Sequence, residues 1–403
     1  MPSRSSLRVA LISHTFGEYC VRLANGLAQH AQVLLLLPTH IAAPHLARLK
    51  DGVRLFRFQN PRFRQPILQF SMLRTLFRTI REFGPDLIHY QGGHPWLDLA
   101  LPCLRRHPLV LTIHDFKPHP GDRLSKKTPL WMEGLARRQA DELIVHTRFV
   151  RDQVMGELPA SAERISVIPH IQIGRDWLST LIRDDGDVIL FFGRIWPYKG
   201  LEYLIRAEPL ITARVPEANI LIAGQGENFS HYYQMMVHPD RFIVDNGFIP
   251  DERAADYFAR ASVVVLPYIE ASQSGVVSLA YSAAKPVVAT AVGGLPEMVE
   301  HGRTGYLVPP RDAPRLAESV ARLLLDADLR HQMGSNGKRK IEAECSADIV
   351  ARKTMEVYRR AIERSARNGG RAMVPDRSTV TVEPSGAMNC DDCERDANRT
   401  TLS

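Results

Sequence analysis

The sequence predicts an α/β fold built from two doubly wound parallel-sheet domains in tandem, which face each other across a central cleft. Three observations predict it. The chain has 403 residues, which is too long for one compact core. Short apolar strand-like runs alternate with longer helix-like segments, and the alternation restarts after the polar stretch 183–187. Ligands of such sheets bind at the carboxyl ends of the strands, so we expect a site in the cleft.

The expected elements follow in chain order. In the first domain we expect strands at Arg8–Ser13, Ala31–Pro38, Asp86–Tyr90, Leu109–His114, Glu142–His146 and Ile165–Ile168, with helices over Tyr19–His30 and Pro129–Ala140. In the second domain we expect strands at Val188–Gly193, Asn219–Gly224, Arg241–Val244, Ser262–Pro267, Pro286–Ala289 and Gly305–Val308. A long helix is expected over Ala347–Ser365, followed by a polar tail without periodicity. We therefore divide the chain into Rossmann-like domains 1–178 and 179–345, a helix 346–366 packing back on the first domain, and a disordered tail 367–403.

Composition is that of a soluble enzyme, with 45% hydrophobic and 24% charged residues. No apolar run reaches the roughly 18 residues of a membrane span, and the apolar segment Leu7–Ile12 is too short for a signal peptide. The five cysteines form no disulfide framework, and the pair Cys390 and Cys393 lacks the second pair of a zinc site. We expect a cytoplasmic protein.

Positive charge is concentrated between Arg54 and Arg81, where seven arginines and no acid are interleaved with phenylalanines. This pattern favours an anionic partner. One interpretation is peripheral attachment to the inner face of a membrane, where arginines meet phosphates and aromatic rings enter the interface. Nucleic acid is a weaker alternative and is not expected. The competing interpretation is a solvated helix face whose phenylalanines point into the core.

The densest chemical signal is Phe191–Gly200, a strand that ends in Gly193 and is followed by Arg194 and then Lys199 before a helix. Glycine permits close approach of the backbone, and the two cations lie next to the positive end of a helix dipole. The segment therefore indicates a site for two adjacent phosphates. The alternative is an ordinary turn with solvated basic residues.

A second segment, Tyr268–Val276, follows a strand and opens a helix. Ser272 and Ser274 can cap this helix, and the amides near Gly275 can hold a phosphate. Glu270 at the strand end can accept hydrogen bonds from sugar hydroxyls. A further strand and glycine turn, at 285–290 and 293–297, are expected at the same rim.

With these motifs the chain resembles glycosyltransferase family four, the retaining family with the GT-B architecture, over about residues 7–365. The resemblance rests on Gly193-Arg194 with Lys199-Gly200, Ala223–Glu227, and Lys285–Thr290 with Gly293–Glu297. It implies that Arg194 and Lys199 contact a donor diphosphate, that Glu270 contacts the sugar, and that backbone around Thr15-Phe16-Gly17 faces the donor. It also implies that His114, in Thr112–Asp115, lies by the anomeric centre. The implied catalytic residues are His114, Glu270, Arg194 and Lys199, and the implied donor-binding residues are Gly17, Gly193, Arg194, Lys199, Gly224, Glu270, Ser274, Gly275 and Val276.

One feature departs from the family pattern. The family places a second glutamate eight positions after the first, where it grips the donor ribose. Counting from Glu270 reaches Ser278, and counting back from Lys285 reaches Leu279, and neither is acidic. The sequence instead has Ser-Gln-Ser-Gly at 272–275, which resembles a branch of the same family.

Other candidate residues have alternative explanations. His14 and His94 border the predicted cleft, His170 is expected to be structural, and His114 could be a buried, hydrogen-bonded histidine. Asp185 and Asp187 precede a strand, unlike the acid pair of metal-dependent glycosyltransferases. Since two cations and helix ends can neutralise the diphosphate, we expect no metal and no other cofactor.

The expected function is transfer of a sugar from a nucleotide-diphosphate sugar to a glycan or lipid-linked acceptor. We expect a metal-independent hexosyltransferase of cell-surface polysaccharide or glycoconjugate biosynthesis, and the resemblance implies retention. The alternatives are a sugar-nucleotide epimerase of the same architecture and a catalytically silent sugar-nucleotide binder.

Overall fold

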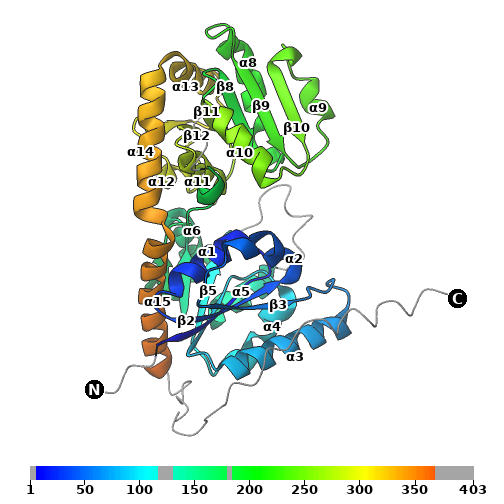
Figure 1. The fold of residues 1–403 in the computed structure, drawn as a ribbon, viewed down its shortest axis with the longest axis vertical. Coiled ribbons are helices and arrows are strands. Elements are labelled where there is room, and N and C mark those ends of the chain that lie inside the picture. The colour runs from blue at the N-terminus through cyan, green and yellow to red at the C-terminus, as the bar shows by residue number, and fades with distance from the viewer. Residues whose placement is uncertain (1–5, 117–129, 179–183, 368–403) are drawn as a thin grey trace, which may run out of the picture. The chain divides into compact units, whose positions relative to one another are not determined.

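The computed structural model describes residues 6–116, 130–178 and 184–367, and it contains two all-parallel sheets (Figure 1). The first sheet has seven strands in the order β3-β2-β1-β4-β5-β6-β7, and the second has six in the order β10-β9-β8-β11-β12-β13. Both orders step outward in two directions from the first strand of the domain, which is the doubly wound topology. The predicted fold class is confirmed, whereas the expected tail lies almost entirely outside the described residues.

The first sheet is built from β1 (Arg8–Ile12), β2 (Gln32–Pro38), β3 (Val53–Phe58), β4 (Leu87–Tyr90), β5 (Leu109–Ile113), β6 (Glu142–Val145) and β7 (Ile165–Val167). Its central strands are buried on both faces because helices cover both sides, which explains their continuous apolar sequences. Its helices are α1 (Gly17–Leu27), α2 (Thr39–Ala42), η1 (Ala43–Arg48), α3 (Pro66–Phe83), α4 (Pro95–Ala100), η2 (Leu101–Leu104), α5 (Leu130–Gln139), α6 (Arg148–Glu157), η4 (Pro159–Arg164) and α7 (Arg175–Leu178).

Strand β3 is the one element of this sheet that the sequence analysis missed. It pairs with β2 in parallel, with Leu35 opposite Leu55, and lies at the sheet edge. Both of its arginines are exposed, Phe58 is buried and its other residues are half-buried, so it lacks the continuous buried apolar run of the central strands. The arginine-rich segment 54–81 thus comprises most of the edge strand β3 and of helix α3. Its charged side chains fit the edge position, because edge strands commonly carry charged residues.

The second sheet is built from β8 (Val188–Phe192), β9 (Asn219–Gly224), β10 (Phe242–Asn246), β11 (Val263–Leu266), β12 (Val287–Thr290) and β13 (Gly305–Val308). All six predicted strands are confirmed within a few residues of their expected ends. Its helices are η5 (Pro197–Lys199), α8 (Leu201–Thr212), α9 (Ser230–Tyr233), η6 (Pro239–Arg241), α10 (Asp251–Arg260), α11 (Gly275–Ser282), α12 (Leu295–Met298), α13 (Ala313–Leu325) and α14 (Ala327–Cys345).

The last helix, α15 (Ala347–Arg367), returns to the first domain (Figure 1). It packs on α1 so closely that a Cβ on Gly26 would lie 2.5 Å from the Ala347 carbonyl oxygen. Tyr358 of α15 is fully buried in the same core as Val9 and Leu11 of β1. The helix therefore supplies part of the first domain's interior. Within the described ranges, no helix is long and apolar enough to cross a membrane.

Candidate active site

The predicted site residues gather at the carboxyl edges of the two sheets. In the second sheet, Gly193 directly follows β8 and touches Gly224, the last residue of β9. Gly193 has a φ of +112°, and a Cβ on Gly224 would lie 1.8 Å from the Gly193 carbonyl oxygen. A Cβ on Gly193 would also contact Val276 at 3.5 Å. Any side chain at Gly224 would therefore clash with the backbone of the Gly193 turn.

Backbone hydrogen bonds hold the turn that carries Arg194 and Lys199. Ile195 N donates to the Gln225 carbonyl at 3.0 Å, and Ile269 N donates to the Tyr198 carbonyl at 2.8 Å. The turn is thus held by the loops that follow β9 and β11. Because both partners are main-chain atoms, the fold sets the backbone positions of Arg194 and Lys199.

Aromatic side chains support both cations. The exposed Arg194 donates from Nη2 to the Tyr198 hydroxyl at 3.0 Å. The Lys199 ammonium lies 3.7 Å from the centre of the Tyr268 ring, within the range of a cation–π contact. Tyr268 is buried, and its hydroxyl lies 3.2 Å from Ser274 Oγ. These contacts connect the arginine, the lysine and the serine in one cluster.

Ser274 is the N-cap of α11, and its Oγ accepts a hydrogen bond from Val276 N at 3.3 Å. Its capping role is therefore confirmed, whereas Ser272 uses its carbonyl to accept from Thr147 Oγ1. Gly275 begins the helix, so the positive end of α11 lies in the cluster with Lys199. Glu270 lies in the same loop with its side chain exposed.

In the first domain, Phe16 and Gly17 come after β1, at the start of α1, and Phe16 lies against His114. Phe16 has a φ of +57°, a strained conformation for an aromatic residue, and its ring stacks on His114 at 3.8 Å. A Cβ on Gly17 would lie 2.6 Å from the Ile41 carbonyl oxygen, so glycine is required there.

His114 is buried at the end of β5, and both of its ring nitrogens contact protein atoms. Nε2 lies 2.8 Å from Gln91 Oε1, and Nδ1 lies 3.2 Å from His146 Nε2. Burial, together with His146, His170 and His89, holds the pKa of His114 well below its ordinary value. The residue is therefore a neutral imidazole at physiological pH.

A cavity of about 570 Å³ opens beside His114, and first-domain residues line it. Its wall includes Phe16, Gln91, His94 and Arg62. The rings of His14 and His94 stack at 3.8 Å, and burial lowers the pKa of His94 to about 4. The cavity is large enough for a sugar ring and is lined by groups that can hydrogen-bond hydroxyls.

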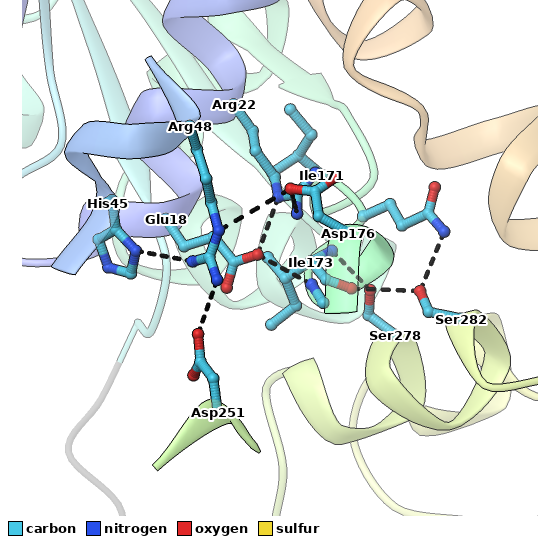
Figure 2. A network of polar contacts seen from close by, with 12 residues as sticks. Glu18, Arg22, His45, Arg48, Ile171, Ile173, Asp176, Asp251, Ser278 and Ser282 are labelled. Carbon is cyan, nitrogen blue, oxygen red and sulfur yellow. Dashed lines mark hydrogen bonds and ion pairs between the residues drawn. The ribbon is translucent and has the colours of Figure 1, made fainter. Parts of the chain in front are cut away.

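Ser278, eight positions after Glu270, has a structural role in this protein. Ser278 Oγ accepts a hydrogen bond from Ile173 N at 3.0 Å, and Ser282 Oγ donates to the Ile173 carbonyl (Figure 2). Ile173 belongs to the segment that crosses from the first sheet to the second. The serine therefore binds the crossover backbone, and Leu279 is buried in the second domain's core.

Acids outside the cluster have protein partners. Asp185 accepts from Arg260 Nε at 3.1 Å. Glu297 accepts from the amides of Arg148 and Phe149 at 2.8 and 2.9 Å, and so caps helix α6 from the second domain. The glycine turn at 293–297 thus also joins the two domains.

Sequence reasoning missed several supporting residues. Tyr268 and Tyr198 were part of the motifs but had no assigned role. Tyr198 adjoins Lys199 in the sequence, whereas no neighbouring basic residue marks Tyr268. Gln91 and His146, which contact His114, also had no assigned role. Both directly follow an apolar strand, the position at which ligand-binding residues of such sheets occur.

Comparisons with known proteins agree with this geometry. Residues 17–171 match the family model described as Glycosyltransferase Family 4, and residues 186–326 match Glycosyl transferases group 1. The chain is 27% identical over 376 residues to an uncharacterized glycosyltransferase of Methanocaldococcus jannaschii, covering 87% of this chain and 95% of that one. It is 28% identical over 314 residues to the alpha-D-kanosaminyltransferase of Streptomyces kanamyceticus, covering 72% and 80%.

Solved structures show the same fold. The sucrose-phosphate synthase of Thermosynechococcus elongatus superposes with a TM-score of 0.69 at 21% identity, covering 89% of this chain and 99% of that one. HepE of Anabaena, in complex with UDP and glucose, superposes with a TM-score of 0.66 at 19% identity, covering 88% and 99%.

Two Rossmann-like domains in tandem give the chain the GT-B fold, and both family models that match it are models of glycosyltransferases. More particularly, the chain carries a family four domain followed by a group 1 glycosyltransferase domain.

Proposed function

We propose that this protein transfers a hexose from a nucleotide-diphosphate sugar to an acceptor held by the first domain. The observation that carries the proposal is the cluster of Arg194, Lys199 and the Ser274-capped helix at one sheet edge. Two cations and a helix N-terminus fit two adjacent phosphates. The structures of HepE with UDP and with UDP-glucose support this class of donor.

The cluster also explains how transfer would be accelerated. Negative charge grows on the departing diphosphate as the bond to the anomeric carbon breaks. Arg194, Lys199 and the amides near Gly275 would bind that charge more strongly in the transition state than in the ground state. Glu270 and His114 would orient the sugar hydroxyls. Retention, and a Ser-Gln-Ser-Gly branch that lacks the second glutamate, are parts of this proposal.

Neutralisation by side chains makes a divalent ion unnecessary in this mechanism. We therefore expect transfer to persist in excess chelator. Loss of activity with EDTA and recovery with manganese or magnesium would contradict this part of the proposal.

The acceptor class in this proposal is a glycan or a lipid-linked glycan of cell-surface polysaccharide or glycoconjugate biosynthesis. Helix α3 supports attachment to an anionic membrane surface from the cytoplasmic side. All seven arginines of the segment 54–81 are exposed, and so are Ile67 at 83% and Phe70 at 70%. The cavity beside His114 is lined in part by Arg62 and Phe63, which lie in the loop that leads into α3. A lipid-linked acceptor could thus reach the cavity from the surface that α3 binds.

A metal-free thermal-shift panel of nucleotide sugars and free nucleotides tests the donor. A ligand that binds only the folded chain raises the melting temperature in proportion to its affinity and concentration. We expect one nucleotide-diphosphate sugar and its free nucleotide to stabilise the protein, and that sugar then to be transferred or slowly hydrolysed. Isomerisation of the donor alone would identify an epimerase, and binding without transfer or hydrolysis a silent binder.

A further inference from the structure

A continuous chain of buried side chains runs through the first domain past His114. It begins at Tyr358 of α15, whose hydroxyl lies 2.7 Å from His89 Nδ1. His89 Nε2 lies 2.7 Å from Thr112 Oγ1 and 3.1 Å from the Gln91 carboxamide. The other end of that carboxamide lies 2.8 Å from His114 Nε2. His114 Nδ1 then contacts His146 Nε2 at 3.2 Å, and His146 Nδ1 ends the chain 3.0 Å from the Ile168 carbonyl oxygen.

The Ile168 carbonyl decides the direction of every hydrogen bond in this chain. A carbonyl oxygen only accepts, so His146 must carry its proton on Nδ1. In a neutral imidazole the other nitrogen is then a lone pair, and His146 Nε2 must accept from His114. His114 therefore carries its proton on Nδ1 and presents a lone pair at Nε2. The opposite direction would place the lone pair of His146 Nδ1 against that of the Ile168 carbonyl.

The same logic orients Gln91. As placed, its Oε1 faces His114 Nε2 and its Nε2 faces His89, but the two ends of an amide exchange by a half-turn about the last torsion. Because His114 Nε2 carries a lone pair, the carboxamide must present its NH₂ group there and its oxygen to His89. His89 then carries its proton on Nε2, which donates to Thr112 Oγ1 and faces the Gln91 oxygen. Its Nδ1 accepts from the Tyr358 hydroxyl. Every member of the chain is satisfied in this one arrangement.

Burial keeps the imidazoles neutral, as this arrangement requires. It lowers the pKa of His89 to about 3, and burial also lowers the pKa of His146 to about 4 although the Ile168 carbonyl opposes the shift. The stacked ring of Phe16 and the edge of Tyr19 cover His114 and keep water from its faces.

We propose that Gln91 and His146 are positioning residues that hold His114 as the Nδ1–H tautomer, so that Nε2 accepts a hydrogen bond from a sugar hydroxyl. In the free protein this lone pair is satisfied by the Gln91 NH₂ group, and a substrate hydroxyl takes its place at the cavity wall. His114 is then an acceptor toward substrate and neither a donor nor a cation. This assignment of the acceptor role rests on the proposed transferase function, whereas the tautomer itself does not.

Imidazole ¹⁵N NMR of the intact chain reads the tautomer directly. We expect His114 and His146 to show protonated Nδ1, and His89 to show protonated Nε2, at neutral pH. Protonated Nε2 on His114, or an imidazolium there, overturns the proposal whether or not the protein is a transferase. No substitution is needed for this measurement.

The variant Gln91→Glu tests the positioning role, because a carboxylate cannot donate to His114 Nε2. We expect the His114 proton to move to Nε2, or a second proton to bind there. Transfer should fall about tenfold or more, with nucleotide binding unchanged because the diphosphate cluster is in the second domain. The matched variant Gln172→Glu changes a buried glutamine outside the chain, which donates to Ser282 Oγ, and should leave the His114 signals as they are. Unchanged His114 signals and full transfer in Gln91→Glu would overturn the positioning role. Absence of transfer in the unsubstituted chain would instead contradict the proposed function and leave the tautomer standing.

Discussion

At the residue scale, Arg194 and Lys199 are held in place before any ligand arrives. Main-chain hydrogen bonds fix the turn between them, Arg194 donates to the Tyr198 hydroxyl, and the Lys199 ammonium lies over the Tyr268 ring. Groups that are already oriented stabilise developing charge without the cost of reorganisation. Arg206, by contrast, is an exposed side chain on α8 that pairs with Glu202 one turn away and lies 5.5 Å from the centre of the Tyr203 ring.

We expect Arg194→Ala or Lys199→Ala to lower transfer on the order of 100-fold, because each removes a charge-assisted contact to the departing diphosphate. Steady-state transfer assays and calorimetric titration of the free nucleotide measure the effect. The control is Arg206→Ala on α8, which should behave like the parent protein. Near-normal turnover in both site variants would refute the phosphate assignment.

Ser278 offers a second test at this scale. Because its Oγ accepts from Ile173 N and the side chain is 2% exposed, we expect Ser278→Glu to lower the unfolding temperature and not to add a ribose contact. A buried carboxylate with one hydrogen bond is costly. Ser278→Ala should lose less stability than the glutamate variant. Increased nucleotide affinity in Ser278→Glu would show that the position faces the donor after all.

At the element scale, the exposure of the phenylalanines in and around α3 distinguishes the core interpretation of the arginine-rich segment from the membrane interpretation. Phe58 is buried, and Phe56 and Phe77 pack against the same core, so these three fit the core interpretation. Phe63 and Phe70 are exposed at 41% and 70%. Ile67, Phe70 and Arg74 share one face of the helix, as their spacing of three and four residues dictates. That face combines apolar and cationic side chains, as a membrane-surface helix does.

We therefore expect the protein to co-sediment with vesicles that contain anionic lipid, and to be released as salt is raised. Each basic residue contributes about 1 kcal/mol near such a surface, and the Debye length falls from about 10 Å at 0.1 M to about 3 Å at 1 M. A variant with Arg62, Arg64, Arg74 and Arg78 changed to Gln should bind much less.

The matched control changes Arg303, Arg315, Arg322 and Arg339 to Gln. All four are exposed residues of the second domain, and their substitution removes as many positive charges as the first variant does. Equal loss in both variants would indicate a non-specific charge effect. No binding of the parent protein at low salt would leave α3 without a membrane role.

At the scale of the whole molecule, the crossover segment is held by residues from both domains (Figure 2). From the first domain, Glu18 accepts from Gly174 N, and Arg22 pairs with Asp176 at 2.8 Å. From the second domain, Ser278 and Ser282 bind Ile173. Arg48 pairs with Asp251 of α10 at 2.7 Å and so joins the domains beside the crossover.

Asp184 performs a similar task where the chain enters the second domain. It pairs with the buried Arg330 of α14 at 2.9 Å. Burial raises the pKa of its carboxyl, but hydrogen bonds from Ser262, Arg330 and the Gly186 amide outweigh burial and lower the pKa to about 2. A folded-state pKa below the unfolded value of about 3.9 stabilises the protein above that value, and the contribution is lost as the pH falls toward 2.

We expect Asp184→Asn to lower the free energy of unfolding by on the order of 2 kcal/mol at pH 7. The gap between the parent and the variant should narrow as the pH falls from 5 toward the lowest value at which the parent still folds. Urea unfolding at a series of pH values measures it. The exposed Asp240→Asn serves as the control for general charge. A gap that stays constant with pH would show that ionisation of Asp184 is not its source.

The sequence by itself determined the two-domain α/β fold, twelve of the thirteen strands of the described residues, and the cluster of Arg194, Lys199 and Ser274. These depend on local patterns, since apolar runs, strand-ending glycines and neighbouring cations lie within a few residues of one another. Strand β3 escaped because its two exposed arginines interrupt the apolar run. Such charges are tolerated at a sheet edge, and only the pairing with β2 shows that the segment lies there. The predicted positions of Arg194, Lys199, Ser274 and Gly275 came together because parallel strands end at one edge.

Only the tertiary structure decided what the remaining polar residues do. Ser278 binds Ile173, which precedes it by 105 residues, and His89 meets Tyr358, which follows it by 269. No local pattern encodes such partners, because they arise when separate elements pack together. The direction of the histidine chain likewise depends on the Ile168 carbonyl, 22 residues after His146. Hydrogen-bond roles are set by the partner, and the partner is set by the fold.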